Sequence, residues 1–275
     1  MPEPYIAFLG RLYSSYTIAL GIGILLSGIL VFFRLRPTHR ARTILDLHIM
    51  MLITALVVGR AFHVAAHLDY YQLHPAEITR LDQGGLDWHG VVWGNLIVMA
   101  AFAQHQRISS AALLNAFAPA LPIMMFAAWW GCHAASCSYG AEVQNMSQYP
   151  AWMVWEGPDI YGLRVPRFYT QSIGTLLALA LLMIERLLDW AAHTRQIPFN
   201  RFGLILVLLS LGMFGIGFLR GDAALWIAGL RSDQWLDLIT IVIALVLLVL
   251  LSRSHDASRK KGYDSAKHTL SPESD

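Results

Sequence analysis

His89 is the residue in this chain that is best suited to move a proton. It lies in the segment G-G-L-D-W-H-G (residues 84–90), where a long polar connection meets an apolar run. A neutral imidazole can accept a proton from a thiol or a hydroxyl near neutral pH, and Gly90 leaves space beside the ring for a bulky substrate. On this segment alone, a histidine that is only hydrogen-bonded in place is the commoner case.

Three arginines lie inside or near the ends of apolar runs and could bind an anion together. Arg60 follows Gly59 inside such a run, and an arginine at the centre of a bilayer costs about 2.5–3.5 kcal/mol, so it needs a polar partner or an anionic ligand. Arg167 and Arg220 stand near the ends of later runs. Guanidinium groups match phosphate oxygens, so the three predict a cradle for one phosphate. The alternatives are side chains that reach the interface and local pairing, for example of Arg220 with Asp222.

The chain has two cysteines, Cys132 and Cys137, in the segment W-W-G-C-H-A-A-S-C-S-Y-G (residues 129–140). A disulfide fits an oxidising compartment, and two small side chains that pack in a turn are the bland alternative. A metal site with His133 does not match a standard zinc spacing, and a catalytic cysteine has no activating neighbour. The sequence therefore predicts no metal and no cofactor, and leaves the disulfide and the packed turn open.

Transmembrane helices must position these side chains. Apolar residues make up 56% of the 275 residues and charged residues 14%, whereas a soluble domain has about 25% charged residues. The apolar residues form blocks with roughly the length needed to cross a hydrocarbon core of about 30 Å. We predict an all-α bundle of about seven spans: Tyr16–Phe33, Leu45–Ala66, Val91–Ala103, Ala111–Trp130, Ser172–Ile184, Phe202–Leu219 and Leu236–Leu251.

Basic residues predict the orientation of this bundle. If the connection after the first span is cytoplasmic, thirteen Lys and Arg residues lie on that side and six on the other, and all three lysines are among the thirteen. Cytoplasmic loops are enriched in these residues. The N-terminus is therefore expected outside the cytoplasm and the C-terminus inside it.

Two long connections, His67–Trp88 and Gly131–Gln171, are expected on the outer face. They are rich in Gly, Pro, aromatic and acidic residues, and long ordered loops commonly carry function. Residues 1–251 are expected to form one membrane domain, and the polar residues 252–275 a disordered cytoplasmic tail.

Taken in order, these segments resemble the prolipoprotein diacylglyceryl transferase family over nearly the whole chain, from about Tyr13 to Leu251. Each segment alone would be weak evidence, but their collinear order is specific. The segments that carry the resemblance are S-Y-T-I-A-L-G (15–21; family S-Y-G…A-L-G), G-R-A-F, D-Y-Y and H-P-A-E-I (59–62, 69–71 and 74–78; family G-[AG]-R-L…Y-Y…P-x-E-I), residues 84–90 (family G-G-[LM]-S-F-H-G-G), A-P-A-L-P (118–122; family A-P-[AV]-x-P) and T-Q (170–171; family H-P-[ST]-Q-L-Y-E).

The resemblance implies an enzyme of the bacterial cytoplasmic (inner) membrane. Such an enzyme moves a diacylglyceryl group from phosphatidylglycerol onto the lipobox cysteine thiol of a prolipoprotein and releases glycerol 1-phosphate. Its partners would be phosphatidylglycerol, the signal-peptide segment with the lipobox and the lipid bilayer, with no nucleic acid. In that scheme a histidine helps to deprotonate the thiol and arginines hold the phosphate. The resemblance implies a catalytic role for His89 and substrate binding by Tyr16, Arg60, Tyr139, Arg167, Gln171 and Arg220.

Several family positions differ in this chain, which marks it as a divergent member. The family signature G-R-x-G-N-F-x-N-G-E aligns with residues 128–137, where Trp129 replaces the arginine and Cys132 the asparagine. Met213 and Gly217 stand where the family's R-x-x-x-E-x-x-R has an arginine and a glutamate. Two other functions therefore stay open: a transferase with another lipid or acceptor, and a non-catalytic protein that binds lipid or lipopeptide.

The predicted orientation is testable with reporter fusions. A reporter placed after Leu251 is expected to behave as cytoplasmic, and one inserted within Gln144–Tyr161 as external, because of the distribution of basic residues. Alkaline phosphatase, which is active only outside the cytoplasm, and a fluorescent protein that matures only inside it form a matched pair. An externally active C-terminal fusion would overturn the orientation.

Overall fold

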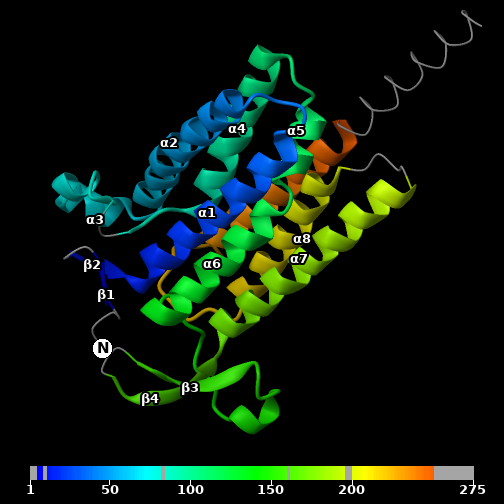
Figure 1. Ribbon diagram of the computed structural model, residues 1–275. Coiled ribbons are helices and arrows are strands. Elements are labelled where there is room, and N and C mark those ends of the chain that lie inside the picture. The colour runs from blue at the N-terminus through cyan, green and yellow to red at the C-terminus, as the bar shows by residue number, and fades with distance from the viewer. Residues whose placement is uncertain (1–4, 9–10, 82–83, 160–161, 196–199, 251–275) are drawn as a thin grey trace, which may run out of the picture.

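The computed structural model describes residues 5–8, 11–81, 84–159, 162–195 and 200–250. Its main body is a bundle of long helices that lie side by side (Figure 1). The helices are α1 (Ser15–Leu35), α2 (Ala41–Ala66), α3 (Leu68–Leu73), α4 (Trp88–Gln106), α5 (Ser110–Phe117), α6 (Ala120–Ala135), α7 (Thr170–Arg195), α8 (Arg201–Gly217) and the C-terminal helix Ser232–Leu250.

Within the described residues, five helical segments are long and apolar enough to cross a membrane. They are α1, α2, the Ser110–Ala135 segment that joins α5 to α6, α7 and the C-terminal helix. α8 is a shorter apolar helix, and α4 has 19 residues. The chain is therefore a polytopic helical membrane protein, and these seven segments of its described part correspond to the seven predicted spans.

Helix boundaries differ from the predicted spans in two ways. The short predicted spans Val91–Ala103 and Ser172–Ile184 are the middle parts of the longer helices α4 and α7. The fourth predicted span is interrupted at Ala118 and Pro119, between α5 and α6. Proline has no backbone N–H, so it cannot donate the hydrogen bond that would continue the helix through this point.

Small residues let the helix backbones approach closely, as in many membrane bundles. α1 packs on α6, where a Cβ at Gly23 would lie 2.6 Å from the Cβ of Ala127. α2 packs on α4, where a Cβ at Gly90 would lie 2.7 Å from the carbonyl oxygen of Val58. The second contact brings the end of α2 beside the start of α4, so the space at Gly90 that was expected to admit a substrate is filled by α2.

Three antiparallel hairpins lie among the described residues, and the all-α prediction did not include them. Figure 1 shows α3 and the first two hairpins at one end of the bundle, opposite the loop between α4 and α5. The predicted cytoplasmic tail, residues 252–275, lies outside the described residues. The hairpins pair β1 (Tyr5–Phe8) with β2 (Arg11–Ser14), β3 (Val154–Pro158) with β4 (Arg164–Phe168) and β5 (Trp226–Ile227) with β6 (Leu230–Arg231).

The opposite end of the bundle holds a cluster of charged side chains on α1, α7 and α8. Glu185 is fully buried, and its carboxylate lies 3.3 Å from the guanidinium of Arg34 and 3.4 Å from that of Arg201. Asp189 lies 2.8 Å from Arg34 and also pairs with Arg201. Each of these charges has an opposite partner, which is the condition for burying ions in a low-dielectric interior. The cluster therefore joins the ends of three helices.

An apolar cluster joins α6, α7 and α8 nearer the hairpin end. Trp129 is buried and packs with Met125, Ala178 and the partly buried Met213. Its indole ring lies over Gly174 of α7, where a Cβ would stand 2.3 Å from the ring. The absence of a side chain at residue 174 is therefore what admits the tryptophan.

Gly174→Ala is expected to destabilise the protein by about 1–3 kcal/mol, the usual cost of overpacking a core. The reason is that the buried indole ring cannot retreat from the new Cβ without moving its neighbours. Thermal unfolding in detergent micelles, followed by the helical circular dichroism signal, measures the effect. Gly215→Ala in α8 is the matched control, because a Cβ at that position would meet no atom within 4 Å among the described residues beyond its own chain neighbours and the backbone of its own helix. Equal melting temperatures for the two variants would contradict this packing.

Candidate active site

His89 lies between two carboxylates at the start of α4. Its Nδ1 is 3.2 Å from Oδ1 of Asp87, and its Nε2 is 3.0 Å from Oδ1 of Asp237. The side chain is 0% exposed, and the ring of Trp88 lies against it with 4.0 Å between centroids. The histidine predicted at the membrane interface is therefore buried, and both of its ring nitrogens have acidic partners.

The two carboxylates determine which protonated form of His89 is stable. Both ring nitrogens donate hydrogen bonds only when the imidazole is protonated. A neutral ring turns one nitrogen lone pair toward a carboxylate oxygen, unless that carboxyl group carries the proton itself. The arrangement thus binds one proton between His89 and its acidic partners, and it gives the ring two anions that stabilise a positive charge.

Asp87 positions His89 through the backbone as well as through the ring. Its side chain caps α4 by accepting hydrogen bonds from the backbone amides of His89 at 2.9 Å and of Gly90 at 3.1 Å. Burial acts to raise the pKa of Asp87, but the hydrogen bonds from His89 and Gly90 lower this pKa below its usual value. Asp87 is therefore an ionised cap that holds the first turn of the helix and the imidazole together.

Neither carboxylate was predicted as a site residue: Asp87 belongs to the segment that carries His89, but Asp237 was not singled out. It lies on the C-terminal helix, 148 residues after His89, and Asp233 stands one turn before it. Asp233 accepts hydrogen bonds from Arg220 at 2.8 Å and from Arg231 at 3.1 Å. The available signal was a pair of acidic residues four apart at the start of an apolar run, where a helix carries both on one face.

The guanidinium of Arg220 pairs with two carboxylates. Its Nε donates to Oδ1 of Asp222 at 2.8 Å, its Nη2 also contacts Asp222, and its Nη1 donates to Asp233. Burial opposes the charge of Arg220, but these acidic partners raise its pKa above the usual value. The sequence offered pairing of Arg220 with Asp222 as one alternative, and the structure confirms this pairing. Binding of a phosphate by Arg220 would have to break it.

Arg60 organises the loop that leads to His89. Its guanidinium is buried, and the guanidinium carbon lies 5.2 Å from the centroid of the Tyr71 ring. The polar partner expected for a membrane arginine is supplied by the backbone of the loop, which includes the short helix η1 (Pro75–Glu77). The guanidinium donates, over distances of 2.7–3.1 Å, to the carbonyl oxygens of Glu77, Ile78, Gly84 and Gly85.

Three other predicted binding residues meet at the segment that follows α6: Tyr139 belongs to it, and Arg167 of β4 and Gln171 of α7 donate to it. Gln171 donates to the carbonyl oxygen of Cys137 at 2.8 Å, and Arg167 donates to that of Gly140 at 3.2 Å. The ring centroid of Tyr139 lies 5.0 Å from the guanidinium carbon of Arg167. The structure thus brings Tyr139, Arg167 and Gln171 together around residues 137–140, a different part of the chain from the loop that Arg60 holds.

A disulfide and a tyrosine mark the end of α6. Cys132 and Cys137 form a disulfide, which confirms one of the two alternatives that the sequence left open. Gly131, next to the first cysteine, contacts Tyr16 of α1, since a Cβ there would lie 2.8 Å from the tyrosine ring. The predicted site residue Tyr16 is therefore a packing neighbour of the disulfide turn.

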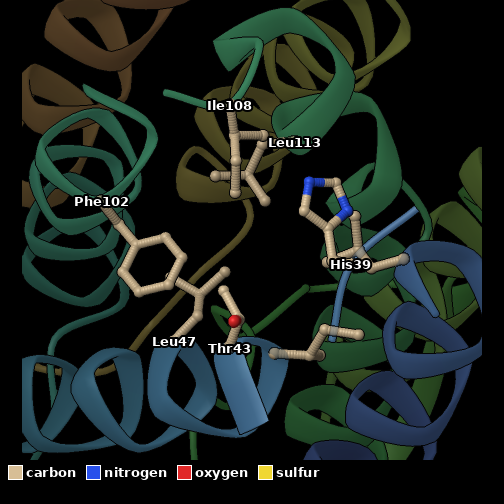
Figure 2. Close-up of a pocket in the computed structure, with 8 residues that line it drawn as sticks. His39, Thr43, Leu47, Phe102, Ile108 and Leu113 are labelled. Atoms are coloured by element: carbon tan, nitrogen blue, oxygen red, sulfur yellow. The ribbon is translucent and has the colours of Figure 1, made fainter. Parts of the chain in front are cut away.

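An apolar cavity lies at the other end of α2 and α4 (Figure 2). Phe102, which lines it, is near the end of α4 that is opposite to His89. This cavity therefore does not belong to the histidine site, and its lining offers few groups for chemistry. The lining residues are Leu35, His39, Thr43, Ile44, Leu47, Phe102, Ile108 and Leu113.

The sequence matches the family model described as "Prolipoprotein diacylglyceryl transferase" over residues 5–250. A relative from Streptococcus agalactiae, named phosphatidylglycerol–prolipoprotein diacylglyceryl transferase, is 27% identical over 81% of this chain and 85% of its own. Relatives with the same name are 27% identical in Limosilactobacillus reuteri, over 71% of each chain, and 28% identical in Streptococcus pneumoniae, over 76% of this chain and 78% of the relative. The family match includes every residue of the site described above.

Two of the positions that depart from the family pattern belong to an apolar cluster that reaches the neighbour of the buried histidine. Trp129 and Met213 pack in one apolar cluster, and Trp88, the neighbour of the histidine, packs against it. Gly217 leaves the space that Gln234 fills, since a Cβ there would stand 2.6 Å from that side chain. Trp129 and Met213 thus pack with one another, whereas the replacement at Gly217 makes room for Gln234. The cluster presents apolar side chains where the family pattern has charged ones.

Arg60→Ala is expected to release the loop between α2 and α4, because four carbonyl oxygens lose their common donor. Hydrogen bonds to a charged group contribute about 1.5–3 kcal/mol each, so proteolytic cleavage within residues 68–85 should become at least about tenfold faster. Limited proteolysis in micelles, with the fragments identified by mass spectrometry, measures this. Leu73→Ala, at an exposed position of the same loop, is the control. Cleavage at the wild-type rate would show that Arg60 does not hold the loop.

Proposed function

The chain belongs to the prolipoprotein diacylglyceryl transferase family, and we propose that it transfers a diacylglyceryl group from phosphatidylglycerol to the lipobox cysteine thiol of a prolipoprotein. The observation that carries this proposal is a buried histidine, His89, with a carboxylate on each ring nitrogen. A thiol must lose its proton before its sulfur becomes a good nucleophile, and such a group can receive that proton.

The reaction exchanges one bond for another without oxidation or reduction. The thiol loses its proton, and its sulfur attacks the carbon of the diacylglycerol unit that carries the phosphate. A carbon–sulfur bond forms while the carbon–oxygen bond to the phosphate breaks, and glycerol 1-phosphate leaves with the electron pair. The protein must therefore accept one proton and stabilise the negative charge of the leaving phosphate.

His89 and its two carboxylates meet the first requirement. In the proton-accepting form, one ring nitrogen and one carboxylate oxygen face each other without a hydrogen atom between them. The thiol proton removes this repulsion when it binds there, and both carboxylates then stabilise the imidazolium. The side chain of Asp87 is 19% exposed and that of Asp237 is 4% exposed. Because Asp87 is the more accessible of the two carboxylates, the proton reaches the ring from the side on which Asp87 lies.

The bundle supplies the surroundings that these substrates require. Lipid-facing side chains on α1 and α2, such as Leu25 and Val57, are exposed and apolar, so phosphatidylglycerol can reach the protein from the bilayer. We place the chain in the bacterial cytoplasmic membrane with the His89 end outward, in agreement with the distribution of basic residues. The signal-peptide segment with the lipobox then arrives at the end of the bundle that carries the histidine.

A transferase with a different lipid or acceptor is the second candidate, and the apolar cluster around Trp129 favours it. The loss of one donor to a developing oxyanion typically lowers a rate by about 10²–10³. Trp129 and Met213 fill two positions where the family pattern has arginine, and they pack in one apolar cluster. A lipid whose leaving group needs less stabilisation would tolerate this change. A protein that only binds lipid or lipopeptide would tolerate it as well.

Complementation of a strain depleted of its own transferase tests the proposal. The wild-type chain is expected to restore thioether lipidation of a reporter prolipoprotein. His89→Gln is expected to lower the rate by about 10²–10⁴, because general acid–base catalysis contributes that much. Mass spectrometry of the lipidated N-terminal peptide measures the product. His193→Gln is the matched control, since this histidine is exposed at the other end of the bundle.

In the same assay, Asp237→Asn distinguishes a positioning residue from a merely structural one. The rate of this variant is expected to reach half of its maximum at a lower pH, because the imidazolium loses one of its two anions and releases its proton more easily. A structural role would lower the amount of folded protein and leave the pH profile in place. Wild-type lipidation by both variants would contradict the proposal. Failure of the folded wild-type chain to complement would favour the second candidate.

A further inference from the structure

We propose that Arg167 binds the phosphate of the lipid donor, and that this phosphate takes the place of the carboxylate of Glu142. The inference rests on the proposed function, since it names the residue that meets the leaving phosphate. Arg167 lies on β4, three residues before α7 begins. The sequence predicted Arg167 as a binding residue but not the hairpin β3–β4 that carries it, and the proposal gives this hairpin a ligand.

The guanidinium of Arg167 is only partly satisfied. The residue is 7% exposed, its Nη1 donates to the carbonyl oxygen of Gly140 at 3.2 Å, and its Nη2 donates to Oε1 of Glu142 at 2.8 Å. Its Nε is buried and has no hydrogen-bond partner within the described part of the chain. Nε and Nη2 form a fork that matches two oxygens of one phosphate. The carboxylate of Glu142 uses only one of these two donors.

Glu142 is a partner that can be exchanged. Its side chain is 63% exposed, so the carboxylate regains water when it leaves Arg167. An exposed ion partner of this kind contributes little to stability, whereas a buried donor without a partner is unfavourable. A phosphate with two oxygens on the fork would satisfy both Nε and Nη2. The exchange thus replaces one charge-assisted hydrogen bond with two.

The other two arginines predicted to bind phosphate have partners that leave less easily. Arg60 donates to backbone carbonyl oxygens of a loop that cannot turn away without unfolding. Arg220 pairs with Asp222 and Asp233, whose side chains are only 20% and 23% exposed. Of the three, Arg167 is the one whose carboxylate partner faces mainly water.

A short chain of contacts joins Arg167 to the acid–base group. The backbone of Gly140, which accepts a hydrogen bond from Arg167, pairs with the backbone of Arg220. The side chain of Arg220 donates to Asp233 at 2.8 Å, one helical turn before Asp237. Asp237 is the carboxylate that lies 3.0 Å from Nε2 of the histidine. The phosphate site and the proton-accepting group are therefore parts of one connected structure.

Direct binding of phosphatidylglycerol tests this site. The probe is phosphatidylglycerol in dodecyl maltoside micelles, because this detergent carries no phosphate, and native mass spectrometry counts the bound lipid. Glu142→Gln is expected to tighten binding by about threefold to tenfold, because it weakens the carboxylate's competition for the fork. Arg167→Lys is expected to weaken binding by at least about tenfold, because an ammonium group keeps the charge but lacks the planar pair of donors.

Matched controls separate this effect from general electrostatics and from adventitious anion binding. Glu156→Gln removes the same charge from an exposed position on the neighbouring strand β3, and it is expected to leave binding unchanged. Glycerol 1-phosphate and inorganic phosphate are added as competitors. The lipid should bind most tightly, because only the lipid also buries acyl chains. Equal competition by inorganic phosphate would overturn the assignment to a lipid headgroup.

Two further results would overturn the proposal. One is an equal change in binding for Glu142→Gln and Glu156→Gln, and the other is wild-type binding by Arg167→Lys at an unchanged melting temperature. In either case Arg167 is only a structural residue of the hairpin. Binding is measured without turnover, so the test holds even if the chain does not catalyse the transfer. If the chain binds the lipid as expected but fails to complement, the proposed function is contradicted and the phosphate site is supported.

Discussion

A charged or polar group inside a bilayer must find its partner within the protein, and this constraint organises both ends of the bundle. At one end, Arg60 has four backbone carbonyl oxygens and His89 has two carboxylates. At the other end, Glu185 lies between Arg34 and Arg201. The partners come from different helices and loops, so the pairing of the charges also determines which elements adjoin.

The group formed by His89, Asp87 and Asp237 shows how many parts of the chain one set of paired charges requires. Its imidazole comes from α4, one carboxylate from the cap of that helix and the other from the C-terminal helix. The loop before the cap is fastened to α2 by Arg60. Three distant parts of the chain must therefore be in place before His89 has its two partners. Beside this group, Trp129 and Met213 pack in one apolar cluster, at two positions where the family pattern has arginine.

The sequence predicts those parts of the structure that depend on a local pattern of residues, chiefly the membrane helices. Apolar runs of membrane length predict the helices, because length and hydropathy are properties of one segment. The partners of Arg60 are backbone carbonyl oxygens, and these carry no residue signature. Asp237 is separated from His89 by 148 residues, so one sequence without its relatives could not reveal the pair. The five-residue hairpin strands are too short for a clear alternation of apolar and polar residues.

The position of Arg60 along the chain has a consequence for biogenesis. Its four acceptors follow it by 17 to 25 residues. A ribosome makes the arginine first, so α2 meets the translocon while its guanidinium still lacks every carbonyl that later surrounds it. Until the carbonyl groups that accept from Arg60 have emerged and folded back, an unpaired guanidinium inside the bilayer is unfavourable. The helix can limit this free-energy cost only by keeping the end that carries Arg60 among the lipid headgroups. The insertion of α2 is thus complete only when the loop has folded onto it, which couples two steps that most membrane helices complete separately.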